Sequence, residues 1–298
     1  MREPVLAIDI GGTKILAALV ADGAVFHERQ IVTERNLGAD AWCEAVAGLA
    51  AGWRGRFDRV GAAVTGIVAD GRWHALNAGI LPVPAGFPVV GALSTRLGCP
   101  VLAIKDAQAA AWGEFRFGAG QGRDLVFLTV STGIGGGIVL GGRLLVGGRG
   151  LAGHFGQSRD HADSERIEDL AGGRAIAAAA RAAGHDLDAA GVSRAAEQGA
   201  SWAGALLDDS ARRLASLATS IQITLDPTLI VLGGGVGLGR GYLDRVLRAL
   251  ADVDQRFRPD IRPAMLGARA GIAGVADLAT GGGRIQGGED VCERLFSH

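Results

Sequence analysis

Asp106 stands at the junction between two kinds of sequence, in the stretch Val101–Phe115 (VLAIKDAQAAAWGEF). The first four residues are apolar and have the length of a buried strand, whereas the alanines after Asp106 favour a helix. An Asp at such a junction often caps the helix, because its side-chain oxygen accepts a free backbone N–H. The carboxyl end of a strand is also where open α/β folds bind ligands, so Asp106 is a candidate general base as well.

A segment that could bind phosphate lies near the N-terminus. The apolar run Val5–Ile10 contains one acid, Asp9, and a second apolar run begins at Ile15. Glycines between two strands let backbone N–H groups approach an anion, although a plain hairpin turn also needs glycine. This order predicts a β-hairpin whose tip, with an added hydroxyl and cation, is formed by Gly11, Gly12, Thr13 and Lys14.

The same design occurs again in the middle of the chain. Leu125–Val130 is typical of a strand, Ser131–Gly137 is rich in Gly and contains Thr132 and Gly133, and Ile138–Leu140 is apolar again. The two copies are alike in pattern but not in identity. Such a duplicated hairpin with a phosphate-type tip suggests two related lobes that close on a nucleotide from either side.

A third glycine cluster follows the predicted strand Pro227–Leu232 and precedes a predicted helix, Tyr242–Ala251. A strand that enters a glycine turn and then a helix is a suitable seat for adenosine and its phosphates. The alternative is a tight β-to-α turn, for which glycine is the usual residue. The cluster consists of Gly233, Gly234 and Gly235.

The composition limits the kinds of partner. The chain has 298 residues, of which 48% are hydrophobic and 20% charged, so it can bury a large core in two lobes. A net charge of −1 argues against nucleic acid as the main binding partner. No apolar run reaches the roughly 18 residues of a membrane span, and the N-terminus leads directly into a strand without a signal peptide. Three cysteines without CxxC spacing indicate a reduced, cytoplasmic location.

The motifs AIDIGGTK, AIKDAQAAAWGEF, FLTVSTGIGGGIV, GLAGHFG and VLGGGVGL follow one another in an order that resembles the ROK family of sugar kinases. The likeness extends to about residue 280, and the motif sequences are most similar to those of bacterial N-acetylmannosamine kinases. No helix-turn-helix precedes the first motif, so the repressor branch is not expected. The resemblance implies an actin-like ATPase (ribonuclease H-like) fold, which is α/β, with two lobes, mixed β-sheets and a central cleft.

The expected domain boundaries follow from this fold and from the glycine-rich break Gly118–Gly122. We expect a small N-terminal α/β lobe of residues 1–117 and a large C-terminal α/β lobe of residues 118–269. A helix at about 270–280 would pack back on the small lobe. Residues 281–298 would form a tail.

The resemblance also implies a reaction. Asp106 matches the base that takes the proton from a hexose 6-hydroxyl as it attacks the γ-phosphate of ATP, which is bound with Mg²⁺. The first substrate to expect is N-acetylmannosamine. The alternatives are a glucokinase or other hexose kinase of the family, and a catalytically degenerate sensor of sugar or nucleotide. The family also implies a homodimer.

The other motif residues take binding roles from the same resemblance. The cofactor-binding positions are Asp9, Gly11, Gly12, Thr13, Lys14, Thr132, Gly133, Gly233, Gly234 and Gly235. The sugar-binding positions are Gly66, Asn77, Lys105, His154 and Glu168. A histidine alone is more often structural, and only the place of His154 within GLAGH favours a sugar contact.

Two departures from the family pattern concern the sugar. The family usually has Asn before the catalytic Asp, whereas this chain has Lys105, which can only donate hydrogen bonds and is charged. Lys105 is expected either to alter the sugar that is accepted or to favour an acidic substrate. The usual Asn-Leu pair of the sugar loop is replaced by Ile80 and Leu81, with Asn77 as a nearby substitute.

A third departure concerns zinc, which the family usually binds through a His and a CxCGxxGC run. Gln157 stands in place of that His, and no cysteine lies between Cys99 and Cys292. The loop before Glu168 is short (HADSERIE). We therefore expect no zinc. Its expected replacement is a set of salt bridges among Arg159, Asp160, Glu165 and Arg166.

Overall fold

The computed structural model describes residues 3–76, 79, 81–160 and 164–287. Asn77, Ile80 and His161 lie outside the described residues. The chain forms two compact units: unit 1 comprises residues 1–122, 137–152 and 268–298, and unit 2 comprises residues 123–136 and 153–267. Residues 118–122 and 137–152 therefore belong to unit 1, although the sequence places them in the second lobe.

Unit 1 is built on a five-stranded mixed sheet with the order β3-β2-β1-β4-β7. The strands β1, β2 and β3 form an antiparallel meander, and β4 and β7 are parallel to β1. The meander arises because short turns at residues 11–13 and 22–23 join the two apolar strands β1 and β2 and the largely exposed strand β3. The strands are β1 (Val5–Ile10), β2 (Lys14–Ala21), β3 (Ala24–Val32), β4 (Val60–Val64) and β7 (Val101–Lys105).

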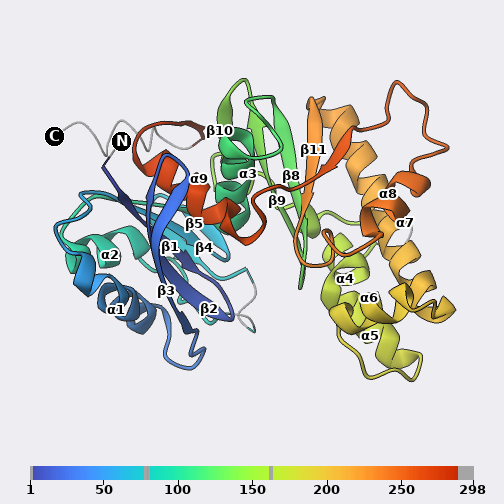
Figure 1. Cartoon of the computed structure of the whole chain (residues 1–298), viewed down its shortest axis with the longest axis horizontal. Coiled ribbons are helices and arrows are strands. Elements are labelled where there is room, and N and C mark those ends of the chain that lie inside the picture. The colour runs from blue at the N-terminus through green and yellow to red at the C-terminus, as the bar shows by residue number, and fades with distance from the viewer. Residues whose placement is uncertain (1–2, 77–78, 80, 161–163, 288–298) are drawn as a thin grey trace. The chain divides into compact units, whose positions relative to one another are not determined.

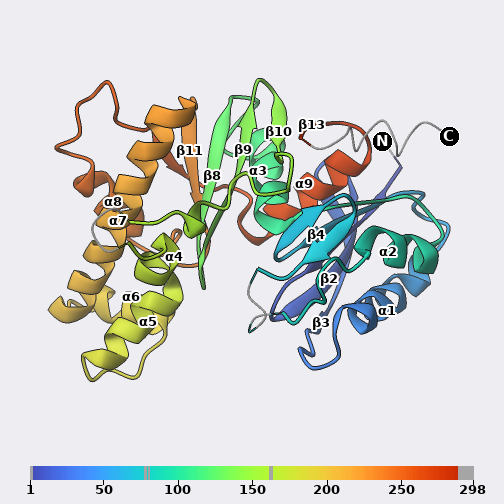
Figure 2. The same ribbon diagram turned by 180° about the vertical axis from the view of Figure 1, so that it is seen from behind.

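Helices cover both faces of this sheet. Figures 1 and 2 show α1 (Ala39–Ala50) and α2 (Val89–Leu97) on one side of it and α9 (Ala270–Ala279) on the other. The first face is filled by a hydrophobic cluster that includes Trp42, Trp73 and Leu93, all of which are fully buried. The helix α9 also packs closely on α3 (Asp106–Phe117). Gly274 permits this approach, since a Cβ there would meet the carbonyl oxygen of Ala109.

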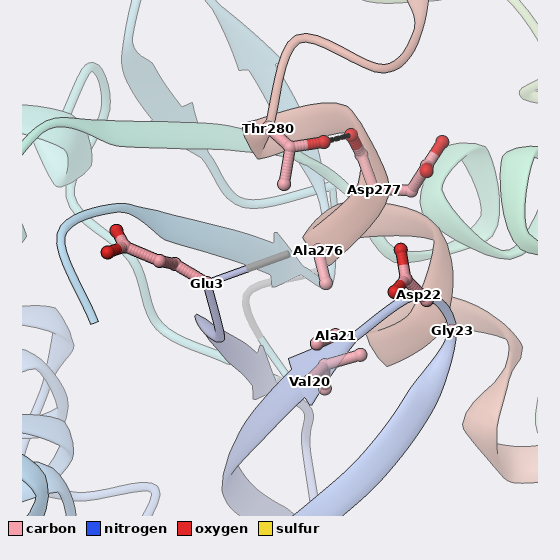
Figure 3. Close-up of a pocket in the computed structure, with 8 residues that line it drawn as sticks. All are labelled: Glu3, Val20, Ala21, Asp22, Gly23, Ala276, Asp277 and Thr280. Carbon is pink, nitrogen blue, oxygen red and sulfur yellow. Dashed lines mark hydrogen bonds between the residues drawn. The ribbon is translucent and has the colours of Figure 1, made fainter. Parts of the chain in front are cut away.

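The C-terminal end of α9 is tied to α3 by a buried carboxylate. Asp277 accepts hydrogen bonds from Trp112 Nε1 at 2.8 Å and from Arg116 Nε at 3.1 Å. Figure 3 shows Asp277 and Thr280 beside the turn Asp22–Gly23, with the Thr280 hydroxyl donating to the Asp277 carbonyl at 2.7 Å. Asp277 therefore serves the packing of unit 1.

Residues 137–152 join unit 1 through a second group of strands. The strand β9 (Ile134–Leu140) begins in unit 2 and ends in unit 1, where it pairs antiparallel with β10 (Arg143–Leu145). The strand β13 (Arg284–Gln286) pairs parallel with β10, and Val146 N–H donates to Gln286 O at 2.9 Å. The expectation of a tail from residue 281 is therefore corrected at residues 284–286, which backbone pairing holds in place.

Unit 2 contains three parallel strands, in which β11 pairs with both β8 and β12. Its long helix α7 packs on α8 and α4, and Ser210 on α7 bonds to Ala171 O at 2.8 Å and to the Tyr242 hydroxyl at 2.7 Å. The elements are β8 (Leu125–Val130), α4 (Ile167–Ala171), α5 (Gly173–Ala182), α6 (Ala189–Glu197), α7 (Ser201–Leu225), β11 (Leu229–Gly233), α8 (Tyr242–Ala249) and β12 (Ile261–Pro263).

The remaining elements are short: the hairpin β5 (Ile67–Ala69) and β6 (Arg72–His74), and 3₁₀ turns at Ala51–Trp53, Phe155–Gln157 and Gly267–Arg269. The α/β class and the mixed sheets expected from the sequence are confirmed. None of the helices in the described part of the chain has both the length and the apolar character needed to cross a membrane.

Candidate active site

Three parallel strands of unit 1 end at the same edge of the sheet. Ile10 on β1 lies opposite Val64 on β4, which lies opposite Lys105 on β7. The next residue of each strand is therefore brought to one place, and these residues are Gly11, Thr65 and Asp106. This is the edge at which open α/β sheets bind ligands.

Asp106 is the first residue of α3, and each of its carboxylate oxygens accepts one hydrogen bond. Oδ1 accepts from Ala107 N–H at 2.6 Å, and Oδ2 accepts from the Thr65 hydroxyl at 2.9 Å. Asp106 thus satisfies one free N–H of the first turn from the first helical position, whereas the N-cap residue is Lys105. Its side chain is nevertheless half-buried rather than enclosed, which leaves room for a reacting group.

Thr65 is a residue that the sequence analysis did not single out, although it precedes Gly66. Its N–H donates to Ile10 O at 3.2 Å, and its carbonyl accepts from Trp73 Nε1 at 2.9 Å. Gly66 adopts φ +130°, and a Cβ there would lie 2.5 Å from the carbonyl oxygen of His74. Its position directly after a strand was the only local signal for this contact, because its hydrogen-bond partner, Asp106, lies 41 residues later in the chain.

The first glycine loop is held through its carbonyl groups. Gly11 N–H donates to Lys14 O at 3.0 Å, and the Thr33 hydroxyl donates to Gly11 O at 2.7 Å. Arg35 Nε donates to Gly12 O at 2.9 Å. The side chains of Thr13 and Lys14 are exposed. An exposed hydroxyl and ammonium on a fixed glycine turn fit the phosphates of a nucleotide.

Asp9 lies on β1, one residue before the strand ends. Burial, together with the negative charge of Asp106, raises the pKa of Asp9 to about 7, while Lys14 acts in the opposite direction. Asp9 and Asp106 are therefore close enough to repel each other. A buried carboxylate such as Asp9 beside a phosphate loop fits Mg²⁺, which binds through one or two carboxylates together with phosphate oxygens.

The second glycine loop, in unit 2, is fixed by the start of α5. Gly173 N–H donates to Ser131 O at 2.8 Å, and Arg174 N–H donates to Thr132 O at 3.0 Å. A Cβ on Gly172 would lie 2.6 Å from Glu168 O and 3.1 Å from Gly133 Cα. This close approach explains why the chain breaks at Gly172 between α4 and α5.

Glu168 on α4 lies against this second loop. A Cβ on Gly133 would be 2.8 Å from Glu168 Oε2, and Glu168 Oε1 accepts a hydrogen bond from Gln157 Nε2 at 2.7 Å. Arg166 Nη1 lies 3.7 Å from Glu168 Oε1 and also donates to Gln157 Oε1 at 3.4 Å. Gln157 and Arg166 therefore hold one oxygen of a largely buried carboxylate, and the other oxygen faces the loop.

The third glycine cluster packs on the end of β8. Val236 N–H and Gly237 N–H donate to Val130 O at 3.0 and 3.1 Å. Gly234 has φ +87°, and a Cβ there would lie 2.3 Å from the same carbonyl oxygen. Since Val130 leads directly into Ser131, the structure brings the second and third glycine loops together at the carboxyl ends of β8 and β11.

The predicted site residues thus form two groups. Unit 1 holds Asp9, Gly11, Gly12, Thr13, Lys14, Gly66, Lys105 and Asp106; unit 2 holds Thr132, Gly133, His154, Glu168, Gly233, Gly234 and Gly235. Lys105 is the last residue of β7 and is only 5% exposed. His154 is half-buried and precedes the 3₁₀ turn that contains Gln157.

The polar loop before Glu168 differs from the expected set of salt bridges. Arg166 Nε pairs with Asp169 Oδ2 at 2.6 Å, and Asp160 pairs with Arg213 at 3.5 Å. The Arg159 guanidinium donates to the Ser164 carbonyl. The loop is therefore tied to α4 and α7 as well as to itself. In the described part of the chain, no three His, Cys, Asp or Glu side chains are grouped so that they could hold a metal ion.

Solved structures share this fold over nearly the whole chain. The ROK hexokinase from Thermus thermophilus has a TM-score of 0.79 and 33% identity, with coverage of 93% of this chain and 98% of that one. A ROK family glucokinase from Streptomyces griseus, in complex with glucose and AMPPNP, has a TM-score of 0.79 and 31% identity, with coverage of 93% and 99%. The actin-like ATPase fold expected from the motifs is thereby confirmed.

Sequence relatives agree with the structures. The bifunctional enzyme NanE/NanK of Brucella melitensis is 50% identical over 279 residues, which are 93% of this chain and 54% of the relative. This chain thus spans about half the length of such bifunctional relatives. The N-acetylmannosamine kinase of Escherichia coli K12 is 42% identical over 287 residues, 93% of this chain and 98% of the relative. Residues 5–281 match the ROK family, and the chain belongs to that family.

Proposed function

We propose that this chain is a kinase that transfers the γ-phosphate of ATP to the 6-hydroxyl of N-acetylmannosamine. The observation that carries the proposal is the placement of Asp106 and the first glycine loop at the ends of parallel strands in one register. The relatives named N-acetylmannosamine kinase support the choice of sugar, because one of them is matched over 98% of its length.

In this proposal, Asp106 accepts the proton of the 6-hydroxyl on one of its carboxylate oxygens. Each oxygen uses one lone pair for the hydrogen bonds described above and keeps another for the sugar. ATP, bound with Mg²⁺, supplies the phosphoryl group, and such transfer depends on positioning and charge neutralisation. Thr13 and Lys14, with the glycine loops, would hold the phosphates, while Asp9 would take Mg²⁺.

The sugar would be held by hydrogen-bonding groups from several segments. Glu168 offers a carboxylate oxygen that accepts from vicinal hydroxyl groups, and His154 offers a ring nitrogen. Gly66 lets the backbone lie close to the His74 carbonyl, where the Cβ of any other residue would clash. Asn77, which lies outside the described residues, completes the proposed set together with Lys105.

A second candidate is a glucokinase or another hexose kinase. The observation that favours it is Lys105, a buried residue with only donors at a position where the family uses an amide. A change from amide to ammonium alters which sugar oxygens can be bound, so the preferred hexose could differ from that of the relatives. We further propose that the protein is cytoplasmic and forms a homodimer. Analytical ultracentrifugation of the purified protein would test the dimer.

The test is coupled ADP release with Mg-ATP across N-acetylmannosamine, glucose, mannose, N-acetylglucosamine, fructose and no sugar. We expect turnover on N-acetylmannosamine, and a fall in kcat of at least about a hundredfold in Asp106→Asn, since a general base contributes that much. ATP binding by the variant, measured by calorimetry, serves as the control and should persist.

Each other result has a defined meaning. Turnover on a different hexose would keep the mechanism and change the substrate. Retained ATP binding without turnover on any sugar would contradict the kinase proposal and favour a sensor of sugar or nucleotide.

A further inference from the structure

The carboxylate of Asp106 is fixed by two donors that come from different parts of unit 1. The Ala107 N–H belongs to its own helix, whereas the Thr65 hydroxyl belongs to the end of β4. A carboxylate with a single donor can rotate about its Cβ–Cγ bond, because that terminal torsion is broad. The bond from Thr65 Oγ1 to Oδ2, at 2.9 Å, therefore determines the plane of the carboxylate.

Thr65 can perform this role because its own backbone is held on both sides. Its N–H donates to Ile10 O at the end of β1, and its carbonyl accepts from Trp73 Nε1. Trp73 is fully buried and contacts Trp42 with ring centroids 5.9 Å apart. The hydroxyl is thus connected to the rigid hydrophobic core on one side of the sheet.

The position that follows makes the arrangement stiffer. Gly66 has φ +130°, and a Cβ there would lie 3.1 Å from Trp73 Nε1 and 2.5 Å from the carbonyl oxygen of His74. The backbone after Thr65 therefore lies directly against the residues that support it. Only glycine allows this approach, which keeps the Thr65 carbonyl within reach of the indole N–H.

We infer that Thr65 is a positioning residue, which orients the Asp106 carboxylate toward the substrate hydroxyl through its own hydroxyl group. This inference rests on the proposed kinase function. Thr65 would not need to touch the substrate. Its contribution would affect the rate of the chemical step more than sugar binding, because misorientation of a base lowers the population of the reactive geometry.

The test compares two variants that differ only in the feature at issue. Thr65→Val keeps the shape of the side chain but removes the donor, and Thr65→Ser keeps the donor but removes the methyl group. We expect kcat to fall about ten- to a hundredfold in Thr65→Val, the loss typical of a hydrogen bond to a charged group, while KM for sugar changes less than about threefold. Thr65→Ser should recover kcat to within about threefold of the wild type.

A double variant separates this role from a structural one. If Thr65 acts through Asp106, then Thr65→Val should have little further effect in an Asp106→Asn background, because coupled residues are not additive. Equal losses of kcat in Thr65→Val and Thr65→Ser, or wild-type kcat in Thr65→Val, would overturn the inference. So would an undiminished effect of Thr65→Val in the Asp106→Asn background.

A crystallographic readout keeps the inference independent of activity. In Thr65→Val we expect the Asp106 carboxylate to rotate or to adopt more than one conformer, and in Thr65→Ser to stay as in the wild type. An unchanged single conformer in Thr65→Val would overturn the positioning role. If the wild type shows no turnover on any sugar, the proposed function fails, while this structural comparison still decides whether Thr65 orients Asp106.

Discussion

Two neighbouring carboxylates of unit 1 have different surroundings. Asp106 accepts two hydrogen bonds, from Thr65 and Ala107, at the half-buried start of a helix. Asp9 lies within β1, where burial is the largest cause of a pKa of about 7, and the charge of Asp106 is the second. The Asp106 carboxylate is therefore stabilised by two donors, whereas Asp9 holds a negative charge at a free-energy cost unless a cation is nearby.

The raised pKa of Asp9 predicts a pH-dependent effect on stability. Its folded pKa of about 7 exceeds the unfolded value of 3.8, so between these pH values the folded protein keeps a proton that the unfolded chain has lost. The free energy of unfolding therefore falls as pH rises from about 4 to about 7. We expect Asp9→Asn to be more stable than the wild type at pH 8, by up to about 4 kcal/mol, with the difference vanishing toward pH 4.

Urea denaturation of the protein without nucleotide, at both pH values, measures this difference. Asp252→Asn is the matched control, because Asp252 is exposed and its neutralisation should change stability little at either pH. An Asp9→Asn variant that is no more stable than the wild type at pH 8 would refute the argument.

At the scale of elements, the loop before α4 positions a proposed sugar ligand. The 3₁₀ turn at Phe155–Gln157 and the start of α4 are joined by the hydrogen bond from Gln157 to Glu168, with Arg166 beside it. Glu168 is only 9% exposed, so its carboxylate needs such donors. The loop thus fixes the Glu168 carboxylate of α4 through the Gln157 amide and the Arg166 guanidinium.

Removal of the Gln157 amide should therefore weaken sugar binding. We expect Gln157→Leu to raise KM for the sugar about tenfold, the value of a hydrogen bond to a charged group, with a smaller change in kcat. Gln157→Glu should be worse, because it places a second negative charge beside Glu168. Steady-state kinetics with the sugar as the varied substrate measures both, and Gln198→Leu on the exposed end of α6 is the control. An unchanged KM in both Gln157 variants would contradict this role for the loop.

At the scale of the whole molecule, the described residues of unit 2 are held together by buried helix contacts and by ion pairs. The helix α7 carries Ser210, which bonds to α4 and α8, and Arg213, which pairs with Asp160 of the loop. The part of the chain that the structure describes offers no cluster of three metal-ligating side chains. These contacts join the loop, α4, α7 and α8 within the described part of unit 2.

We therefore expect zinc to be dispensable for both folding and activity. Metal analysis of the purified protein should find far less than one zinc per chain. Treatment with EDTA, followed by removal of the chelator and addition of Mg²⁺ alone, should leave the melting temperature and the kcat unchanged, because structural zinc contributes folding free energy directly where it is present. A melting temperature that falls after EDTA and recovers only with zinc would refute this expectation.

The features predictable from the sequence are those that local chemistry specifies. Apolar runs of strand length, the glycine clusters between them and the Asp at a strand–helix junction are visible along the chain, and their order is enough to indicate the α/β class and the family. These features can be predicted because a turn or a strand depends mainly on its own residues and immediate neighbours.

The remaining features depend on long-range contacts that no local pattern specifies. The register of β1, β4 and β7 brings Thr65 to Asp106, the bond from Gln157 selects one oxygen of Glu168, and backbone pairing with β10 turns part of an expected tail into β13. Thr65 and Asp106 lie 41 residues apart and β10 and β13 farther still, while Gln157 and Glu168, 11 residues apart, belong to different elements. Their meeting results from strand pairing and packing summed over the whole unit, because the entropy of closing such long loops is offset only by many contacts formed together.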